Sequence, residues 1–183
     1  MENVITKIRN ELIRAVSGID AWFDKDEALL NHKHAKGEKT CRELLHEVMM
    51  SNRYLLQTID NGRTSASSLK STIDVPLDEY RLRSQELLDA AINKKVSFDF
   101  QSKECENLQE VRAELREQLD RCLIHLELLI AEKGALFTTS LSVGSLGCLD
   151  VYQSIYFMAV HVRLYLGQLD AILADYNHET ERA

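Results

Sequence analysis

Proline and glycine are scarce in this chain, with one proline and seven glycines among its 183 residues. An all-β fold needs a turn every ten residues or so, and turns are built largely from these two residues. Their scarcity therefore argues against an all-β fold and leaves room for long helices. The length suits a single domain, residues 1–183, which can bury roughly 70% of the surface of its unfolded chain.

Basic residues are not in excess either. The chain has 22 lysines and arginines against 29 aspartates and glutamates, which gives a net charge of −7. A protein that binds the phosphate backbone needs a concentrated basic surface, and none is apparent in this composition. We therefore expect no nucleic-acid partner.

The chain also lacks the marks of a secreted or membrane protein. The opening "MENVITKIRN" is charged and has no apolar core like that of a signal peptide. The charge-free run in the most apolar segment, about residues 151–162, is shorter than the roughly 20 residues that cross a bilayer. We expect a cytoplasmic protein with no membrane partner and with reduced thiols, since its four cysteines form no CxxC pair: Cys41, Cys105, Cys122 and Cys148.

No familiar catalytic motif stands out. The glycines of "SVGSLG" and "HAKGEKT" lack the spacing of phosphate-binding or dinucleotide-binding loops. Cys41 opens a predicted helix, where the helix N-terminus can lower a thiol pKa and make a nucleophile. The alternative, which we prefer, is that Cys41 lies on an apolar stripe as a small hydrophobic residue.

Apolar residues recur at spacings of three and four, which is typical of amphipathic helices. The last helix is apolar on nearly every side, so we expect it at the centre of the fold. The pattern predicts an all-α fold, a four-helix bundle, with long helices over residues 2 to about 30, 40 to about 59, about 104 to 132 and about 148 to 175.

Residues 61–103 would form a long crossover within that bundle. Its first part, residues 61–73, is rich in serine and threonine, and Pro76 then begins a short extra helix that carries Tyr80 and Ile92. Thr40 and Glu43 have the spacing of a capping box and mark the start of the second long helix.

The histidines differ in what they could do. We expect His32, His34 and His178 at the surface, and arginines at positions 42 and 53 flank His46 and would repel a cation. His161 and Tyr165, in "HVRLYLGQL", are four residues apart and share one helix face. Two histidines at this spacing would be half of a metal site, but a core histidine hydrogen-bonded to a neighbour is the simpler interpretation of His161.

Two segments, "CRELLHEVMMSNRYLLQTID" and "LGCLDVYQSIYFMAVHVRLYLGQLDAIL", resemble the DinB-like superfamily, and specifically its second family of bacterial four-helix proteins. The resemblance implies a four-helix bundle of DinB/YfiT type. It also implies a divalent metal, often nickel or zinc, held by one histidine of the second helix and two of the last. Relatives of this kind are thiol-dependent S-transferases or hydrolases, and the family name refers to a stress response, the induction by DNA damage.

Carried over residue by residue, the family's first ligand position falls on Glu47, with His46 one residue early. The pair on the last helix falls on His161 and Tyr165, and Gln168 matches a family glutamine. The resemblance thus makes Glu47, His161 and Tyr165 the candidate metal ligands, with Tyr165 alternatively a catalytic proton donor. This donor set would suit zinc, iron or manganese, but a phenol must lose its proton to bind well.

Two functions are compatible with this partial match to the family's metal ligands. One is a metal-dependent thiol S-transferase or hydrolase that acts on a small electrophile. The other is a non-catalytic bundle, a small-molecule binder or a homodimeric module, in which Glu47 accepts a hydrogen bond from Tyr165 or from protonated His161 and no metal is bound. A buried carboxylate such as that of Glu47 needs a partner in either case.

Overall fold

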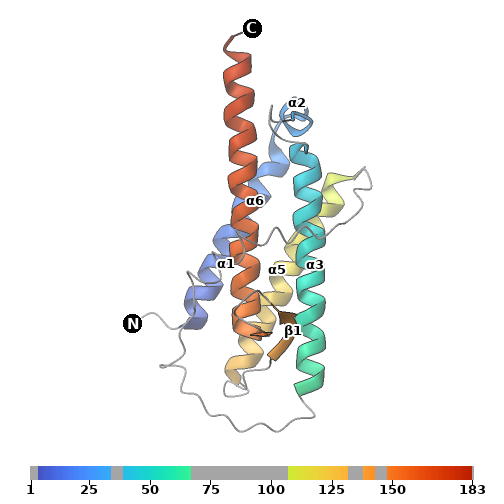
Figure 1. Ribbon diagram of the computed structural model, residues 1–183, viewed down its shortest axis with the longest axis vertical. Coiled ribbons are helices and arrows are strands. Elements are labelled where there is room, and N and C mark those ends of the chain that lie inside the picture. The colour runs from blue at the N-terminus through green and yellow to red at the C-terminus, as the bar shows by residue number, and fades with distance from the viewer. Residues whose placement is uncertain (1–3, 34–38, 67–106, 132–137, 143–147, 183) are drawn as a thin grey trace.

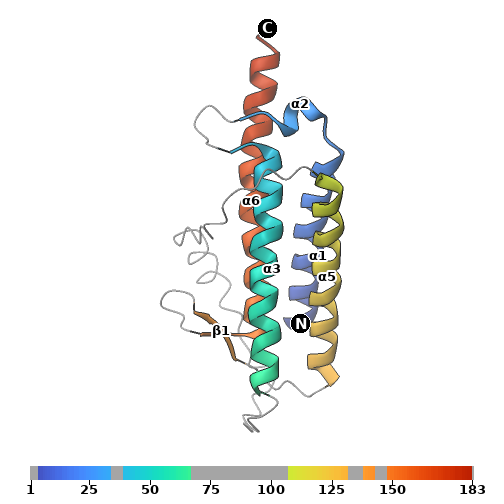
Figure 2. The ribbon, with the colours of Figure 1, turned by 90° about the vertical axis from the view of Figure 1, so that its right-hand side faces the viewer.

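The computed structural model describes residues 4–33, 39–66, 107–131, 138–142 and 148–182, and helices dominate these residues. Four long helices lie side by side in both views (Figures 1 and 2), and they contact one another in a closed ring in which α6 packs on α1 and α3, and α5 packs on α1 and α3. The mostly helical class is confirmed. The long helices are α1 (Val4–Asp20), α3 (Cys41–Ala66), α5 (Leu108–Ala131) and α6 (Val151–Thr180).

The first predicted helix is shorter than its periodicity suggested. Helix α1 ends at Asp20 and is followed by the 3₁₀ turn η1 (Ala21–Asp24) and the one-turn helix α2 (Glu27–Leu30). The prediction of one helix to about residue 30 is therefore wrong. Asp26 causes the break, because its backbone is extended and its side chain accepts a 2.8 Å hydrogen bond from the Leu29 amide, which starts a new helix.

The predicted start of α3 is confirmed. The Glu43 amide donates to Thr40 Oγ1 at 3.1 Å, and the Thr40 amide donates to Glu43 Oε2 at 2.7 Å, which completes the capping box. The helix continues to Ala66, so the prediction of a linker from residue 61 is wrong for residues 61–66. The short helix predicted within the crossover lies outside the described residues.

A small antiparallel ladder precedes the last helix and was not predicted. Strands β1 (Thr138–Ser142) and β2 (Cys148–Asp150) pair, and β2 runs directly into α6. Helix α6 therefore begins at Val151 and not near residue 148. Asp150 sets this boundary, because its carboxylate caps the Gln153 amide at 2.8 Å and the Gln153 side chain accepts from the Asp150 amide in return.

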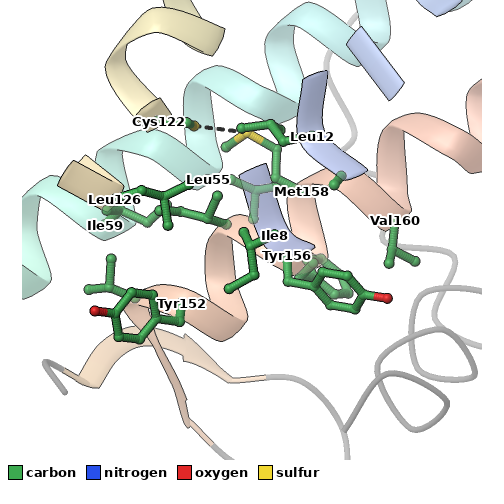
Figure 3. Packing of buried hydrophobic residues seen from close by; sticks show 14 of the residues in the cluster. Ile8, Leu12, Leu55, Ile59, Cys122, Leu126, Tyr152, Tyr156, Met158 and Val160 are labelled. Carbon is green, nitrogen blue, oxygen red and sulfur yellow. Dashed lines mark hydrogen bonds between the residues drawn. The ribbon is translucent and has the colours of Figure 1, made fainter. Parts of the chain in front are cut away.

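Helix α6 is buried along its first half, as its all-round apolar pattern predicted. Figure 3 shows Tyr152 and Met158 of α6 among side chains of the other three long helices, and Cys122 of α5 contacts the Met158 sulfur at 3.6 Å. A second cluster of buried residues lies around Trp22, Leu45 and Leu169. Both clusters contain residues of α3 and of α6, so these two helices pack against each other in each of them.

Among the described helices, α6 is the one that is long and apolar enough to cross a membrane by length and composition. The central helix of a bundle passes the same test, and half of the most apolar stretch of α6 is buried inside the molecule. The expected cytoplasmic location stays a prediction.

An ion-pair network fastens α5 to the end of α1, and it supports a prediction about stability. Asp20 accepts two hydrogen bonds from Arg112, at 3.0 and 2.8 Å, and two from Arg116, at 2.8 and 2.9 Å. These guanidinium groups hold the pKa of Asp20 well below its usual range. The carboxylate therefore stabilises the fold above pH about 4, and its contribution is lost as the pH falls toward the lower pKa of the folded state.

We expect Asp20→Asn to lower the free energy of unfolding at pH 7 by about 1 kcal/mol, since the partly exposed network is screened by solvent. Urea denaturation at pH 7 and pH 3 measures this difference, which should shrink at the lower pH. Asp24→Asn is the matched control, because Asp24 is 66% exposed and bonds Arg112 alone, so its loss should be smaller. An equal loss for both variants would contradict a special role for Asp20.

Candidate functional site

The three residues predicted as a metal site gather where α3 meets α6. Tyr165 is at their centre, with its hydroxyl 3.5 Å from Ser51 Oγ and its ring in edge-to-face contact with His161, centroids 5.0 Å apart. The Glu47 carboxylate interacts with the same hydroxyl, both through its charge and as a hydrogen-bond acceptor. Glu47 and Ser51 are one turn apart on α3, and His161 and Tyr165 are one turn apart on α6.

Tyr165 keeps its proton in this setting. Burial is the largest cause that raises the pKa of its phenol, and the charge and hydrogen bond of Glu47 raise it further, while the hydrogen bond with Ser51 acts in the opposite direction. A phenol whose pKa is raised above its ordinary value of about 10 is neutral at physiological pH. Tyr165 is therefore a hydrogen-bond donor at this site and a poor anionic ligand.

Glu47 already has a cationic partner. The Lys39 ammonium lies 2.5 Å from Glu47 Oε2, and the carboxylate side chain is 15% exposed while that of Lys39 is 49% exposed. Lys39 comes just before Thr40, the capping residue of α3, and its side chain reaches along the first turns of the helix to Glu47. The negative charge of Glu47 is thus balanced within the chain.

His161 is buried between two aromatic rings. Phe157 stacks on one side with ring centroids 6.1 Å apart, and Tyr165 contacts it edge-on. Burial lowers the pKa of His161 to about 4, so the imidazole is neutral at physiological pH. A neutral imidazole can bind a metal or serve as a hydrogen-bond partner in the core.

These properties decide how well a metal would fit. His161 is neutral, as a metal ligand must be, but Tyr165 holds its proton. The Glu47 carboxylate is already paired with the Lys39 ammonium. A three-ligand centre would have to displace Lys39 and deprotonate a buried phenol, and both steps cost affinity. The group therefore fits a metal poorly, and the metal assignment of Glu47, His161 and Tyr165 stays a prediction.

The neighbouring candidates do not complete a metal site. His46 is half-buried, and its pKa is lowered by burial and by the charge of Arg53. Gln168, the match to a family glutamine, is exposed on α6. Cys41 is fully buried and burial raises its pKa to about 11, so the interpretation as a small hydrophobic residue holds and the nucleophile does not.

A different group of ligand-type side chains was missed by the sequence analysis. His32, Asp175 and Glu179 place one ligand atom each within 4.8 Å of one another, and together they could hold a metal ion. His32 was expected at the surface, yet it is half-buried against the ring of Tyr176. The signal was the spacing of Asp175 and Glu179, one helical turn apart, but the last helix was predicted to end near residue 175, which left Glu179 outside it.

No family model matches this chain, and no curated protein or solved structure is significantly similar to it.

Proposed function

We propose that this chain is a DinB-like four-helix bundle that has exchanged the metal centre of such proteins for an internal polar network, and that it acts as a non-catalytic binding module. The observation that carries the proposal is the chain of contacts from Lys39 through Glu47 and Tyr165 to Ser51. The lysine neutralises the carboxylate, the carboxylate accepts from the phenol, and the serine hydroxyl is the phenol's second partner. Such a network satisfies buried polar groups without an ion.

Metal content is the direct test. We expect tag-free protein and its His161→Ala variant to contain the same amount of metal by mass spectrometry after incubation with zinc, nickel, manganese or ferrous iron. The reason is that His161 binds no ion while the Tyr165 hydroxyl donates its hydrogen bond to Glu47. A metal that is near-stoichiometric in the wild type and specifically lost on His161→Ala would overturn the proposal.

As a binding module, the chain would either form a homodimer or bind a small molecule. Light scattering coupled to size exclusion separates them, since the chain mass is 20.9 kDa and a homodimer would double it. A mass that rises toward the doubled value with protein concentration supports the homodimeric form. A constant monomer mass directs the search to small ligands.

A second candidate is the metal-dependent S-transferase or hydrolase, and the neutral imidazole of His161 favours it. Glu47 and His161 would hold a divalent metal such as zinc, nickel, iron or manganese, and the metal would lower the pKa of a bound thiol or water. Tyr165, which keeps its proton, would donate it to the leaving group. Metal lost on His161→Ala, together with thiol-transfer activity lost on Tyr165→Phe, would favour this candidate over the first.

A further inference from the structure

The group formed by His32, Asp175 and Glu179 lies at a different place in the fold from the Tyr165 network. Asp175 is ten residues after Tyr165 on α6, which at 1.5 Å per residue is a separation of about 15 Å along the helix. In both views α2, which ends two residues before His32, is at the end of the molecule toward which the C-terminal part of α6 runs (Figures 1 and 2). The group therefore joins two segments that are distant in the sequence.

The distance between His32 and Asp175 suits a shared ion better than a direct bond. His32 Nε2 lies 3.7 Å from Asp175 Oδ2, which is too long for a hydrogen bond. Two zinc ligands at about 2.0 to 2.2 Å from the metal are about 3.4 Å apart at the tetrahedral angle and about 3.7 Å apart at a slightly wider one. Within the described part of the chain, His32 Nε2 is shielded from solvent and makes no hydrogen bond.

The His32 imidazole is held in place by its surroundings. Its backbone amide donates to the Leu29 carbonyl at 3.0 Å, and the next residue, Lys33, forms a bridge with Thr40. The Tyr176 ring contacts the imidazole edge-on at 5.2 Å, and the His32 side chain is 16% exposed. The nitrogen donor is thus oriented before any ion binds, which lowers the cost of binding.

The charges at this end of α6 favour a cation. Asp175 and Glu179 are one turn apart, so their carboxylates repel each other, and the C-terminal end of a helix carries partial negative charge. Glu179 makes no ion pair with a lysine or arginine among the residues that the structure describes. A divalent ion would relieve both sources of repulsion.

We propose that His32, Asp175 and Glu179 bind one divalent transition-metal ion of the zinc class, which fastens the C-terminal end of α6 to the segment after α2. One imidazole and two carboxylates balance a charge of +2 and leave a fourth position for water. The imidazole selects against calcium and magnesium, which prefer oxygen ligands. This site shares no residue with the Tyr165 network, so its test does not depend on the proposed function.

Calorimetric titration with Zn²⁺ tests the site. We expect one zinc ion to bind per chain, and excess Mg²⁺ not to displace it. The affinity for zinc should fall at least tenfold in Glu179→Gln and in His32→Ala. His178→Ala is the matched control, because His178 is an exposed histidine on the same last turns of α6 and is not part of the group. Equal zinc affinity in the wild type, Glu179→Gln and His32→Ala would overturn the proposal, as would a loss in His178→Ala of the same size.

Hydrogen exchange gives a second measurement that does not depend on His32→Ala folding. Zinc should slow amide exchange over the last turns of α6, residues 171–180, in the wild type and in His161→Ala, but not in Glu179→Gln. Glu179 is exposed, so its substitution by glutamine should leave the fold intact. Protection centred instead around residues 161–165, or lost in His161→Ala, would place the zinc at the Tyr165 network and refute the site at His32.

Discussion

Leu126→Ala is expected to lower the free energy of unfolding by about 2 to 5 kcal/mol, the range for removing a large side chain from a packed core. Leu126 is 2% exposed and lies among Leu55, Ile59 and Tyr152, where three long helices meet (Figure 3). The alanine leaves a cavity that rigid neighbouring helices fill only in part. Chemical denaturation followed by circular dichroism measures the change.

Leu128→Ala is the matched control for this prediction. It removes the same atoms two residues further along α5, from a side chain that is 39% exposed, and should cost about 0.5 kcal/mol or less. If the two alanine variants were equally stable, α5 would not pack with the face that the structure gives it.

The second large effect is a pH dependence that comes from His161. Its pKa is lowered from 6.5 to about 4 by burial, so the unfolded chain binds a proton at this residue more readily than the folded chain does. Stability from this source is fully present above pH about 6.5 and is lost as the pH falls to about 4. The difference in pKa corresponds to about 3 kcal/mol.

Urea denaturation of the wild type and of His161→Gln at pH 7 and pH 4 checks this prediction. We expect the wild type to lose about 3 kcal/mol more than His161→Gln between the two pH values, because glutamine does not titrate. His178→Gln, which removes an exposed histidine from the same helix, should follow the wild type. If His161→Gln kept the pH dependence of the wild type, His161 would have to be solvated or already paired with a negative charge.

The polar network and the His32 group involve different parts of α6. Tyr165 joins the network from the buried middle of the helix, whereas Asp175 and Glu179 lie on its last turns, where packing is sparse. A zinc ion bound by His32, Asp175 and Glu179 would order the C-terminal end of α6, which few side chains cover. Taken together, the two proposals predict that His161→Ala retains zinc and that Glu179→Gln loses it.

Local patterns in the sequence were enough to predict the helical class and the start of α3. The Thr40 and Glu43 capping box needs residues three apart, and the apolar stripe of α3 repeats within each turn, so both are visible without any knowledge of partners. The burial of α6 followed in the same way from its all-round apolar pattern. The break after Asp20 was missed because Trp22 and Phe23 continue the apolar pattern through the 3₁₀ turn and are indeed buried.

The tertiary structure decided what the candidate site residues can do. The sequence put Glu47, His161 and Tyr165 on two helices, and the structure brought them together and added Lys39 and Ser51 as partners. Protonation depends on burial and on neighbouring charges, so neither the neutral phenol of Tyr165 nor the neutral imidazole of His161 can be derived from residue types.

Helix periodicity and capping act between residues a few positions apart, so the long helices and the faces that they bury could be predicted from the sequence. Only the tertiary structure placed His32 beside Asp175 and Glu179, and only it paired β1 with β2 ahead of α6. Contacts between distant segments depend on how the helices pack and where each one ends. A shift of one turn at the end of α6 would have removed Glu179 from the helix and, with it, the third ligand of the group.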